Sequence, residues 1–384
     1  MKNNLNVKIV GAGPTGLLLS IALSKLKFNI YLTDLLSKEK LINKEKTYAI
    51  THSSRIILEK FNLWTNLKPY LYGFDTISIN DSETSKFTNL SISDLDDDIR
   101  PAKNIGWVVK HNDLMNVFFD ELDNNDNIFF KSQQNLSKEE ISFDYQFFAT
   151  GANSLDKKSY KYFYLKKTYN QSCLAFKVQV RGNEKRRAYE IFRKEGPLAL
   201  LPLDKNLYQI IWTSSTSKAQ DRLNSDKNFL MDNLSTILPE NFKLDQIVGE
   251  LSIFPVYLSL NLPIFNLRKL VLVGDLFHTF HPVGGQGLNT CWRDVYSIFN
   301  LLKKRSSNYP YDLNIFKFKY YLNRFIDILV TSIITDSLIT IFANRNLILF
   351  PLRKLSFFLL NKFLFIRKFV LNQMTKSVIF SFIK

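Results

Sequence analysis

The most constraining feature of the sequence is a glycine-rich turn near the amino end, set between an apolar run and a helix-like segment. Residues 7–10 read VKIV, residues 11–16 read GAGPTG, and residues 17–26 are mostly Leu, Ile, Ala and Ser. A second apolar run, residues 29–33, ends at Asp34. A strand, a tight turn, a helix and a second strand in this order and length predict a βαβ unit, so we expect an α/β fold.

The spacing of the three glycines suits a phosphate-binding turn. Gly11 permits the tight turn, Gly13 leaves room for backbone to approach a pyrophosphate, and Gly16 allows close packing of helix on strand. The start of the helix offers unpaired N–H groups and the positive end of its dipole to an anion. Asp34 follows Gly16 by 18 residues, where an acid can bind a ribose hydroxyl. The motif predicts an adenine dinucleotide and by itself does not separate FAD from NAD.

Charge and composition narrow the classes of partner. Apolar residues make up 46% of the 384 residues, enough for a packed core, so disorder is excluded as the main state. The net charge of +16 would suit nucleic acid, but the last 48 residues hold eight basic residues and no acidic ones. No nucleic-acid-binding motif accompanies this uneven charge, so we expect no nucleic acid partner.

Cysteine usage and the amino end indicate a reducing compartment. Cys173 and Cys291 cannot form a disulfide scaffold, and no CxxC pair suggests zinc. Lys2, Asn3 and Asn4 interrupt any early apolar run, so we expect no signal peptide. The expected location is cytoplasmic.

The middle of the chain changes from an α/β pattern to an antiparallel β pattern. Short β-prone runs recur in residues 173–180, 188–192, 197–203, 207–213 and 247–254. A helix is expected between them, at 226–238. Buried strands at 143–150 and 269–273 flank this block, so we expect a second domain inserted into the first.

The expected architecture is therefore a Rossmann-like domain with an inserted antiparallel sheet and a carboxyl-terminal helical region. The acidic stretch 80–104 is expected to be an exposed loop. The expected ranges are 1–75, 104–165 and 260–310 for the dinucleotide-binding domain, 76–103 and 166–259 for the inserted domain, and 311–384 for the helical region.

A second motif, residues 270–294 (LVLVGDLFHTFHPVGGQGLNTCWRD), carries more chemistry. A buried strand delivers Asp275 at its carboxyl end, where the acid can accept hydrogen bonds from a polyol. Gly284, Gly285 and Gly287 would let backbone N–H groups approach a flat, electron-rich ring. The following helix would direct its positive end at that ring and favour a reduced, anionic flavin.

This second motif resembles the GD motif of group A flavoprotein monooxygenases, which have the para-hydroxybenzoate hydroxylase fold. The wording HPVGGQGLN, followed by RDV at 293–295, is similar to the ubiquinone-biosynthesis hydroxylases of the UbiH, UbiF and Coq6 group. Further matches, in the family's order, lie in residues 50–64, 195–203, 209–213 and 254–255. The resemblance covers nearly the whole chain.

The resemblance implies that both motifs hold one FAD. The first motif would bind the pyrophosphate, Asp34 the adenosine ribose and Asp275 the ribityl chain, while Pro282 and the backbone of 285–289 would line the isoalloxazine ring. The implied cofactor residues are Gly11, Gly13, Pro14, Thr15, Gly16, Asp34, Gly274, Asp275, Pro282, Gly285, Gln286, Gly287, Leu288 and Asn289.

The function that the resemblance implies is hydroxylation of the aromatic ring of a polyprenylated phenol in ubiquinone biosynthesis. NAD(P)H would reduce the flavin as a co-substrate, and O2 would then give a flavin C4a-hydroperoxide that transfers oxygen. The protein would bind the flavin, exclude water and hold the ring. This chemistry needs no Ser-His-Asp group, and we assign no residue as general acid or base.

The chain departs from the family pattern at several positions. Thr150 stands where the family carries an Asp that serves FAD and NAD(P)H, and Lys157, Lys46-Thr47 and Asn112 replace expected arginines. Two alternatives stay open: a non-catalytic flavoprotein-fold subunit of a ubiquinone-synthesis complex, partnered by other proteins of that pathway, and an FAD-dependent reductase on the same fold.

The histidines of the second motif invite a metal interpretation. His278 and His281 are three residues apart, but no further ligand of suitable spacing follows. We expect no metal, and a structural or flavin-edge role for both. Cys291 is expected to be a packed helix residue.

The carboxyl-terminal tail interleaves basic and large apolar residues. No uncharged stretch reaches the ~18 residues that a transmembrane helix needs. Up to about residue 350, packing on the flavin domain and an interfacial helix on anionic lipid both remain open. Beyond it, the runs FFLL at 357–360 and FLFI at 363–366 favour contact with a membrane or partner, and thus a peripheral place on the inner, cytoplasmic membrane.

Overall fold

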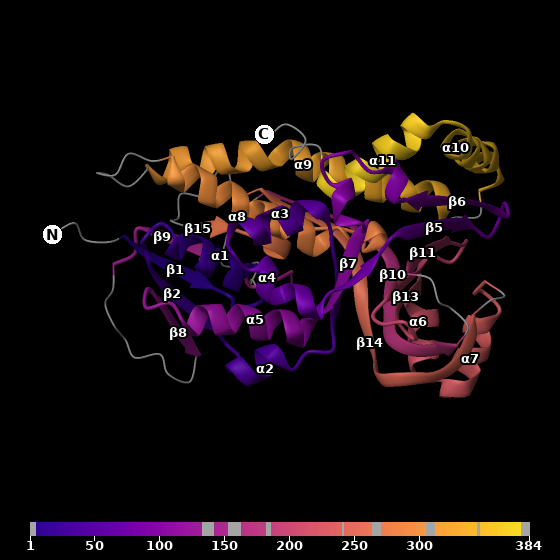
Figure 1. Cartoon of the computed structure of the whole chain (residues 1–384), viewed down its shortest axis with the longest axis horizontal. Helices are drawn as coiled ribbons and strands as arrows, with labels where there is room; N and C mark the ends of the chain where they lie inside the picture. Colours follow the sequence, from indigo (N-terminus) through magenta and orange to yellow (C-terminus); the bar gives the residue numbers. More distant parts are fainter. Residues whose placement is uncertain are drawn as a thin grey trace.

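The computed structural model contains two large sheets with helices packed on them (Figure 1). The expected α/β fold, with an antiparallel second sheet and a helical carboxyl-terminal region, is confirmed. Lys157 and Arg345 lie outside the residues that the structure describes, which are 5–132, 142–152, 163–181, 186–239, 242–262, 270–304, 312–343 and 346–377.

The first sheet is parallel and has the strand order β15-β9-β1-β2-β8. Each strand pairs in parallel with its neighbour, so all carboxyl ends meet at one edge. The sequence does not predict β8, because its apolar run of three residues is too short to show a period. The strands are β1 (Asn6–Val10), β2 (Asn29–Asp34), β8 (Ile128–Ser132), β9 (Tyr145–Phe148) and β15 (Leu270–Leu272).

Helix α1 (Pro14–Ser24) lies at the centre of the first domain. Every residue from Gly16 to Ser24 is buried, because α5 (His111–Asp123) and α8 (Gly287–Lys303) pack against it while it covers the sheet. A helix that is apolar all round needs such complete cover. Three shorter helices complete this part of the fold: α2 (Lys38–Ile42), α3 (His52–Lys60) and α4 (Trp64–Leu67).

The second sheet has eight strands in the order β16-β14-β10-β13-β12-β11-β5-β6. It is antiparallel except where β11 pairs in parallel with β5. Helices α6 (Thr216–Leu223) and α7 (Lys227–Ser235) pack on one face (Figure 1). The strands are β5 (Thr76–Asp81), β6 (Lys86–Ser91), β10 (Phe163–Arg181), β11 (Arg187–Phe192), β12 (Leu198–Pro202), β13 (Leu207–Ser215), β14 (Lys243–Leu262) and β16 (His278–Thr279).

A small three-stranded sheet, β3-β7-β4, joins the two large ones. It consists of β3 (Thr47–Ile50), β4 (Tyr72–Phe74) and β7 (Gly106–Lys110). Strands β3 and β4 were not expected, since four and three residues carry no readable alternation. The expected domain boundaries stay a prediction.

The interpretation of 80–104 as an exposed loop was wrong. This stretch contains β6, and its acidic residues bind the last helix, α11 (Leu364–Lys376). Asp94 is buried and pairs with Arg367 at 3.0 Å, and Lys376 lies 2.9 Å from Asp96 and 2.6 Å from Asp98. Part of the tail's positive charge is therefore neutralised inside the protein.

Helix α9 (Leu313–Phe342) and α8 share a buried network of ion pairs. Arg293 Nε lies 2.7 Å from Asp327, and Arg324 lies 2.7 Å from both Asp327 and Asp294. All four side chains are almost completely buried. Buried charges persist only when they are paired, so this network fixes α9 on the first domain. The remaining tail helix is α10 (Phe350–Lys362).

Replacing Asp327 by Asn should destabilise the protein by about 3–5 kcal/mol, because two buried guanidinium groups lose their shared carboxylate. Thermal or urea denaturation at neutral pH measures the change. The matched control is Asp120→Asn on the exposed side of α5, which should shift stability by no more than about 0.5 kcal/mol.

The acid dependence gives a second readout. Burial opposes ionisation of Asp327, but Arg293 and Arg324 outweigh it and hold the pKa of the carboxyl well below its ordinary value. The stability that it contributes is thus complete above that ordinary pKa and is lost as pH falls through the lowered one. The gap between wild type and variant should narrow in acid, and a gap that stays constant with pH would contradict this assignment.

Candidate active site

The carboxyl edge of the parallel sheet collects both sequence motifs. Val10 at the end of β1 stands in register with Thr33 of β2 and with Phe148 of β9. Phe148 in turn stands beside Leu272 of β15. The turns that follow these strands therefore lie next to one another, at the edge where doubly wound sheets bind their ligands.

The amino-terminal turn is closely packed on its inner side and open on its outer side. A Cβ on Gly16 would lie 1.8 Å from the carbonyl oxygen of Gly11, so only glycine allows helix α1 to pack this close to β1. A Cβ on Gly13 would meet nothing within 4 Å. Space is therefore left where a pyrophosphate would approach the start of α1.

Asp34 fixes the shape of this turn from the end of β2. Its Oδ2 accepts a hydrogen bond from the Ala12 amide at 2.7 Å, and its Oδ1 accepts one from the Leu36 amide at 2.9 Å. Each carboxylate oxygen can accept more than one hydrogen bond, so the contacts leave capacity for a ribose hydroxyl.

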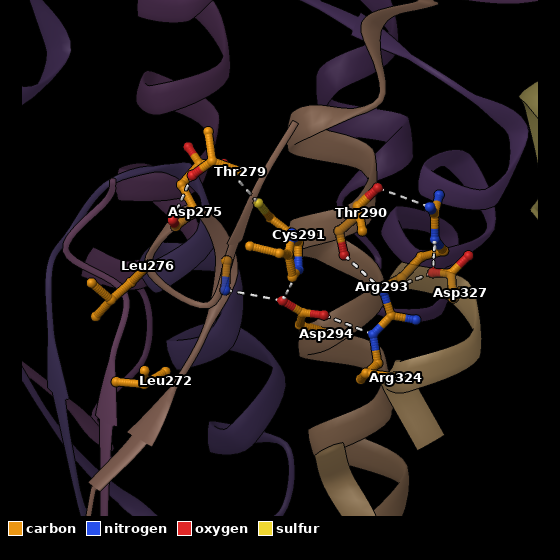
Figure 2. A network of polar contacts seen from close by, with 12 residues as sticks. Leu272, Asp275, Leu276, Thr279, Thr290, Cys291, Arg293, Asp294, Arg324 and Asp327 are labelled. Carbon is orange, nitrogen blue, oxygen red and sulfur yellow. Dashed lines mark hydrogen bonds and ion pairs between the residues drawn. The ribbon is translucent and has the colours of Figure 1, made fainter. Parts of the chain in front are cut away.

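The second motif meets the first although about 260 residues separate them along the chain. A Cβ built on Gly274 would lie 3.1 Å from Cγ2 of Thr15. The thiol of Cys291 lies 3.4 Å from Asp275 Oδ1 (Figure 2), and the side chain of Thr15 lies close enough to lower the pKa of the thiol. Thr15, Gly274, Asp275 and Cys291 thus form one continuous contact between the two motifs.

Asp275 faces water from within the protein. Solvent reaches the side chain, which is exposed, yet protein atoms surround the carboxyl and this desolvation raises its pKa. The two observations agree if the carboxyl lines a narrow, water-accessible space between protein walls. Such a place suits a carboxylate that binds a polyol chain.

Asp294 holds the turn that carries Asp275. Its Oδ2 accepts hydrogen bonds from the Gly274 amide at 3.0 Å and from His278 Nε2 at 2.8 Å. Its Oδ1 accepts one from Arg324 Nε at 2.7 Å (Figure 2). Burial opposes ionisation, but His278 and Arg324 outweigh it and lower the pKa of this carboxyl. The sequence analysis missed this role, because Arg324 comes from a helix whose docking the sequence does not reveal.

The side chain of Asn289 holds the loop from Pro282 to Gly287 in place through contacts with neighbouring segments. The side-chain amide of Asn289 donates to the carbonyls of Ala49 and Gly285, both at 2.9 Å, and its oxygen accepts from Thr51 and Ser54. The Asn289 side chain therefore positions the loop rather than facing a ligand.

Gln286 ties the same loop to the tail. Its Nε2 donates to the carbonyl of Met374 in α11 at 3.0 Å. A Cβ on Gly284 or on Gly287 would meet nothing within 4 Å, which leaves the backbone accessible to a flat ligand. Pro282 and Leu288 are partly exposed beside it, whereas Asn289 is buried.

Neither histidine of the motif is placed as a metal ligand. His278 is engaged by Asp294, and burial lowers the pKa of His281 to about 3, which keeps its ring neutral. Nδ1 of His281 accepts a hydrogen bond from the Val283 amide at 3.1 Å. Among the described residues, no group of three His, Cys, Asp or Glu side chains could hold a metal ion.

Cys291 is a packed residue with no sign of a reactive thiolate. Its side chain is buried, and desolvation raises the pKa of the thiol well above its ordinary value.

Thr150 and Gly151, which follow β9, lie at the same sheet edge as Gly11.

The geometry fits a dinucleotide with one end on each motif. The open start of α1 and Asp34 suit the adenosine pyrophosphate half, while Asp275 and the open loop at 284–287 suit a polyol and a flat ring. Comparisons with known proteins support FAD as the cofactor. A family model described as "FAD binding domain" matches residues 113–306.

Curated relatives include a protein of Synechocystis sp. and two that are named for ubiquinone chemistry. The uncharacterized protein slr1300 of Synechocystis is 28% identical over 317 residues, which cover 76% of this chain and 73% of that protein. Ubiquinone biosynthesis monooxygenase COQ6 of Dictyostelium discoideum is 21% identical, with 82% and 78% covered. The Escherichia coli 3-demethoxyubiquinol 3-hydroxylase is 29% identical over 35% of this chain and 34% of its own length.

Solved structures with the same fold are FAD-type monooxygenases. The p-nitrophenol 4-monooxygenase PnpA of Pseudomonas putida superposes with a TM-score of 0.74 at 16% identity, covering 97% of both chains. PqsL of Pseudomonas aeruginosa, in complex with 2-aminobenzoylacetate, has a TM-score of 0.72 at 13% identity, covering 88% of this chain and 97% of that one. At these identities the likeness establishes the fold.

Two glycine variants separate binding from folding. Gly13→Ala should leave the stability of the FAD-free protein within about 1 kcal/mol, since its Cβ meets no atom, but should weaken FAD binding at least about tenfold. Gly16→Ala should destabilise the fold itself by roughly 1–3 kcal/mol or more. Thermal denaturation of the FAD-free protein and titration with FAD, followed by flavin fluorescence, measure both. Equal FAD affinity in wild type and Gly13→Ala would remove the pyrophosphate from this turn.

Proposed function

The chain belongs to the FAD-binding domain family and has the fold of the FAD-dependent aromatic monooxygenases, and on this premise we propose that it hydroxylates the ring of a polyprenylated phenol in ubiquinone biosynthesis. NAD(P)H is the co-substrate in this proposal. The proposed cofactor residues are those of the two motifs, from Gly11 to Asp34 and from Gly274 to Asn289.

The observation that carries the proposal is the contact between the two motifs. Thr15 touches both Gly274 and Cys291, and Asp275 faces an accessible space beside them. One FAD can therefore reach from the start of α1 to the loop at 284–287. Bound FAD supplies activation of O2 and transfer of one oxygen atom; the protein supplies binding, orientation and exclusion of water.

The names of the relatives support the choice of substrate class. Relatives named for ubiquinone chemistry match this chain from Escherichia coli to animals, and one of these matches covers 82% of this chain. A polyprenylated phenol is an aromatic ring on an apolar chain, so an enzyme that acts on it has to receive the substrate from a bilayer.

Thr150 favours one alternative, a non-catalytic subunit of a ubiquinone-synthesis complex. It follows β9 at the sheet edge where the family carries an acid for NAD(P)H use, and threonine supplies no negative charge there. A reductase that acts without O2 is the remaining alternative on this fold.

The purified protein should be yellow, and NAD(P)H should bleach it under anaerobic conditions. With O2 and a prenylated phenol it should give a hydroxylated product, and Asp275→Ala should lower FAD retention by about tenfold or more. Absorbance at the flavin band, oxygen uptake and product mass measure these steps. Bleaching with a reduced product and no oxygen uptake would identify the reductase, and FAD binding without bleaching would identify the non-catalytic subunit.

We also propose that the outer face of α9 rests on an anionic membrane surface. Ile315, Phe318, Leu322, Phe325 and Leu329 recur at helical spacing and are all exposed, Phe318 by 60%. Exposed Lys319 lies on the same helix, and α10, which contacts α9, carries the exposed Lys354 and Lys362. Apolar residues with basic neighbours are the composition of an interfacial helix.

The inner face of α9 argues for lying on the membrane rather than crossing it. The helix is long and apolar enough to span a bilayer by length and composition. Its other face, however, carries the buried Arg324 and Asp327. The hydroxyl oxygen of Tyr321 also accepts a hydrogen bond from the backbone N–H of Leu272 in the first sheet at 3.0 Å. Spanning would break these contacts. The proposed location is therefore cytoplasmic and peripheral on the inner membrane.

Replacing Phe318 by Glu should reduce binding to vesicles of phosphatidylglycerol and phosphatidylethanolamine roughly tenfold, since an inserted aromatic ring is lost and a negative charge is added. Cosedimentation measures it. The matched control is Phe229→Glu, because Phe229 on α7 is also 60% exposed but lies on another part of the surface. Equal loss in both variants, or no vesicle binding by the wild type, would contradict the proposed surface.

A further inference from the structure

One row of residues across the middle of the eight-stranded sheet carries an acid among apolar residues. Glu190 of β11 stands in register with Ile79 of β5 on one side and with Ala199 of β12 on the other. The row continues through Ile211 of β13 to Ala175 of β10. All five residues are partly exposed, although they lie in the middle of the sheet. Water therefore reaches an apolar wall that holds a single carboxyl group.

Strand alternation shows which way Glu190 faces. Tyr189 and Ile191 pack in the core that contains Leu230 of α7, on the far side of the sheet. Glu190 shares the opposite face with Phe192, which packs with Val283 of the flavin-motif loop. The carboxyl group therefore points from the sheet toward that loop.

The acid lies close to the loop. The backbone N–H of Gly284 faces the Glu190 carboxyl closely enough to lower its pKa, and the Glu190 side chain stays partly exposed. Gly284 adopts a φ of +72° and a Cβ on it would meet nothing within 4 Å, so its backbone is open to both the acid and a ligand. Thr47 Oγ1, which donates to Gln209 Oε1 of β13 at 3.0 Å, anchors the sheet to β3 beside this loop.

We propose that Glu190 is the residue that receives the hydroxyl group of the phenolic substrate and takes its proton. This inference rests on the proposed function and deepens it by naming the group that recognises the phenol. The phenol O–H bond breaks, a carboxyl O–H bond forms on Glu190, and the electron pair stays on the phenolate oxygen. No oxidant takes part in this step. The phenolate ring is richer in electrons than the phenol, which favours attack on an electrophilic oxygen.

The protonation equilibrium of Glu190 suits this task. Burial raises the pKa of the carboxyl to about 7, while the amide of Gly284 opposes the rise. A base titrates most usefully when its pKa lies near the working pH. At neutral pH both the ionised form, which accepts the proton, and the protonated form are populated.

The groups around Glu190 do not share this titration. Burial raises the pKa of the Cys173 thiol in β10 to about 12, and burial lowers the pKa of the His281 imidazole in the loop to about 3. Neither group therefore changes charge between pH 6 and 8. Asp81 of β5 pairs with Arg353 of α10 at 3.8 Å. Strand β12 carries no charged residue, and Lys177 of β10 pairs with Glu45 at 2.8 Å.

The test measures binding of a phenol and of its methyl ether to the oxidised, FAD-loaded protein. The probes are 2-allylphenol and 2-allylanisole, in which a methyl group replaces the proton that Glu190 would take. Wild-type protein should bind 2-allylphenol about tenfold more tightly at pH 8 than at pH 6, as Glu190 ionises. Glu190→Gln keeps the acceptor for Gly284 but should bind 2-allylphenol about tenfold more weakly at pH 8, with no pH dependence.

Binding of 2-allylanisole should be the same in wild type and Glu190→Gln at both pH values. The charge control is Glu250→Gln on the exposed side of β14, which should behave like wild type with both probes. Thermal denaturation and the flavin spectrum show that each variant folds and holds FAD. A second variant, Ala199→Met, should weaken binding of both probes by filling the accessible space beside Glu190.

The outcomes separate this inference from the proposed function. Hydroxylation by wild type with an unchanged pH profile in Glu190→Gln would overturn the role of Glu190 and leave the function standing. Glu190-dependent phenol binding without any hydroxylation would support the role and reject the function. Equal loss of both probes in Glu190→Gln would show that the acid only shapes the space, and overturns the proposal.

Discussion

The carboxylate of Asp294 is the interaction on which the cofactor site depends. It is completely buried, and it holds the amide of Gly274, the ring of His278 and the guanidinium of Arg324 at once. A buried carboxylate is tolerated only with such partners. The turn that presents Asp275 therefore exists in this shape only while α9 is docked, because α9 supplies Arg324.

This dependence gives helix α9 two separate tasks on its two faces. Its inner face supplies Tyr320, Tyr321, Arg324 and Asp327 to the first domain, and its outer face exposes a row of large apolar side chains. The surface that we propose to rest on a membrane is thus rigidly connected to the turn that we propose to hold the cofactor. Several basic residues near the carboxyl end serve the fold instead: Arg367 and Lys376 bind the acidic segment at 94–98. The surface charge of the tail is accordingly smaller than its composition indicates.

The proposed substrate end of the site comes from the docking of the second sheet. The loop at 282–287 is held by Asn289 and, from the tail, through Gln286, and it faces Glu190 of the sheet. A ring held between this loop and the row around Glu190 would meet apolar walls and one acid. A carboxyl group so placed distinguishes a phenol from its ether, because only the phenol has a proton to give.

The sequence by itself determined what depends on local geometry. The turn at 11–16 needs glycines for close approach, Asp34 follows at a fixed distance, and 270–294 reads as strand, loop and helix; each pattern is complete within a short stretch. The alternation of side chains in the runs at 173–180, 188–192 and 207–213 likewise predicted a sheet. Strands β3, β4 and β8 could not be predicted, because three to five residues show too little alternation of apolar and polar side chains. Only the tertiary structure decided which distant charges pair, as in Asp294 with Arg324 or Asp94 with Arg367, and that Glu190 meets Gly284. Such pairs form because packed elements bring them together, and the spacing along a chain does not contain that distance.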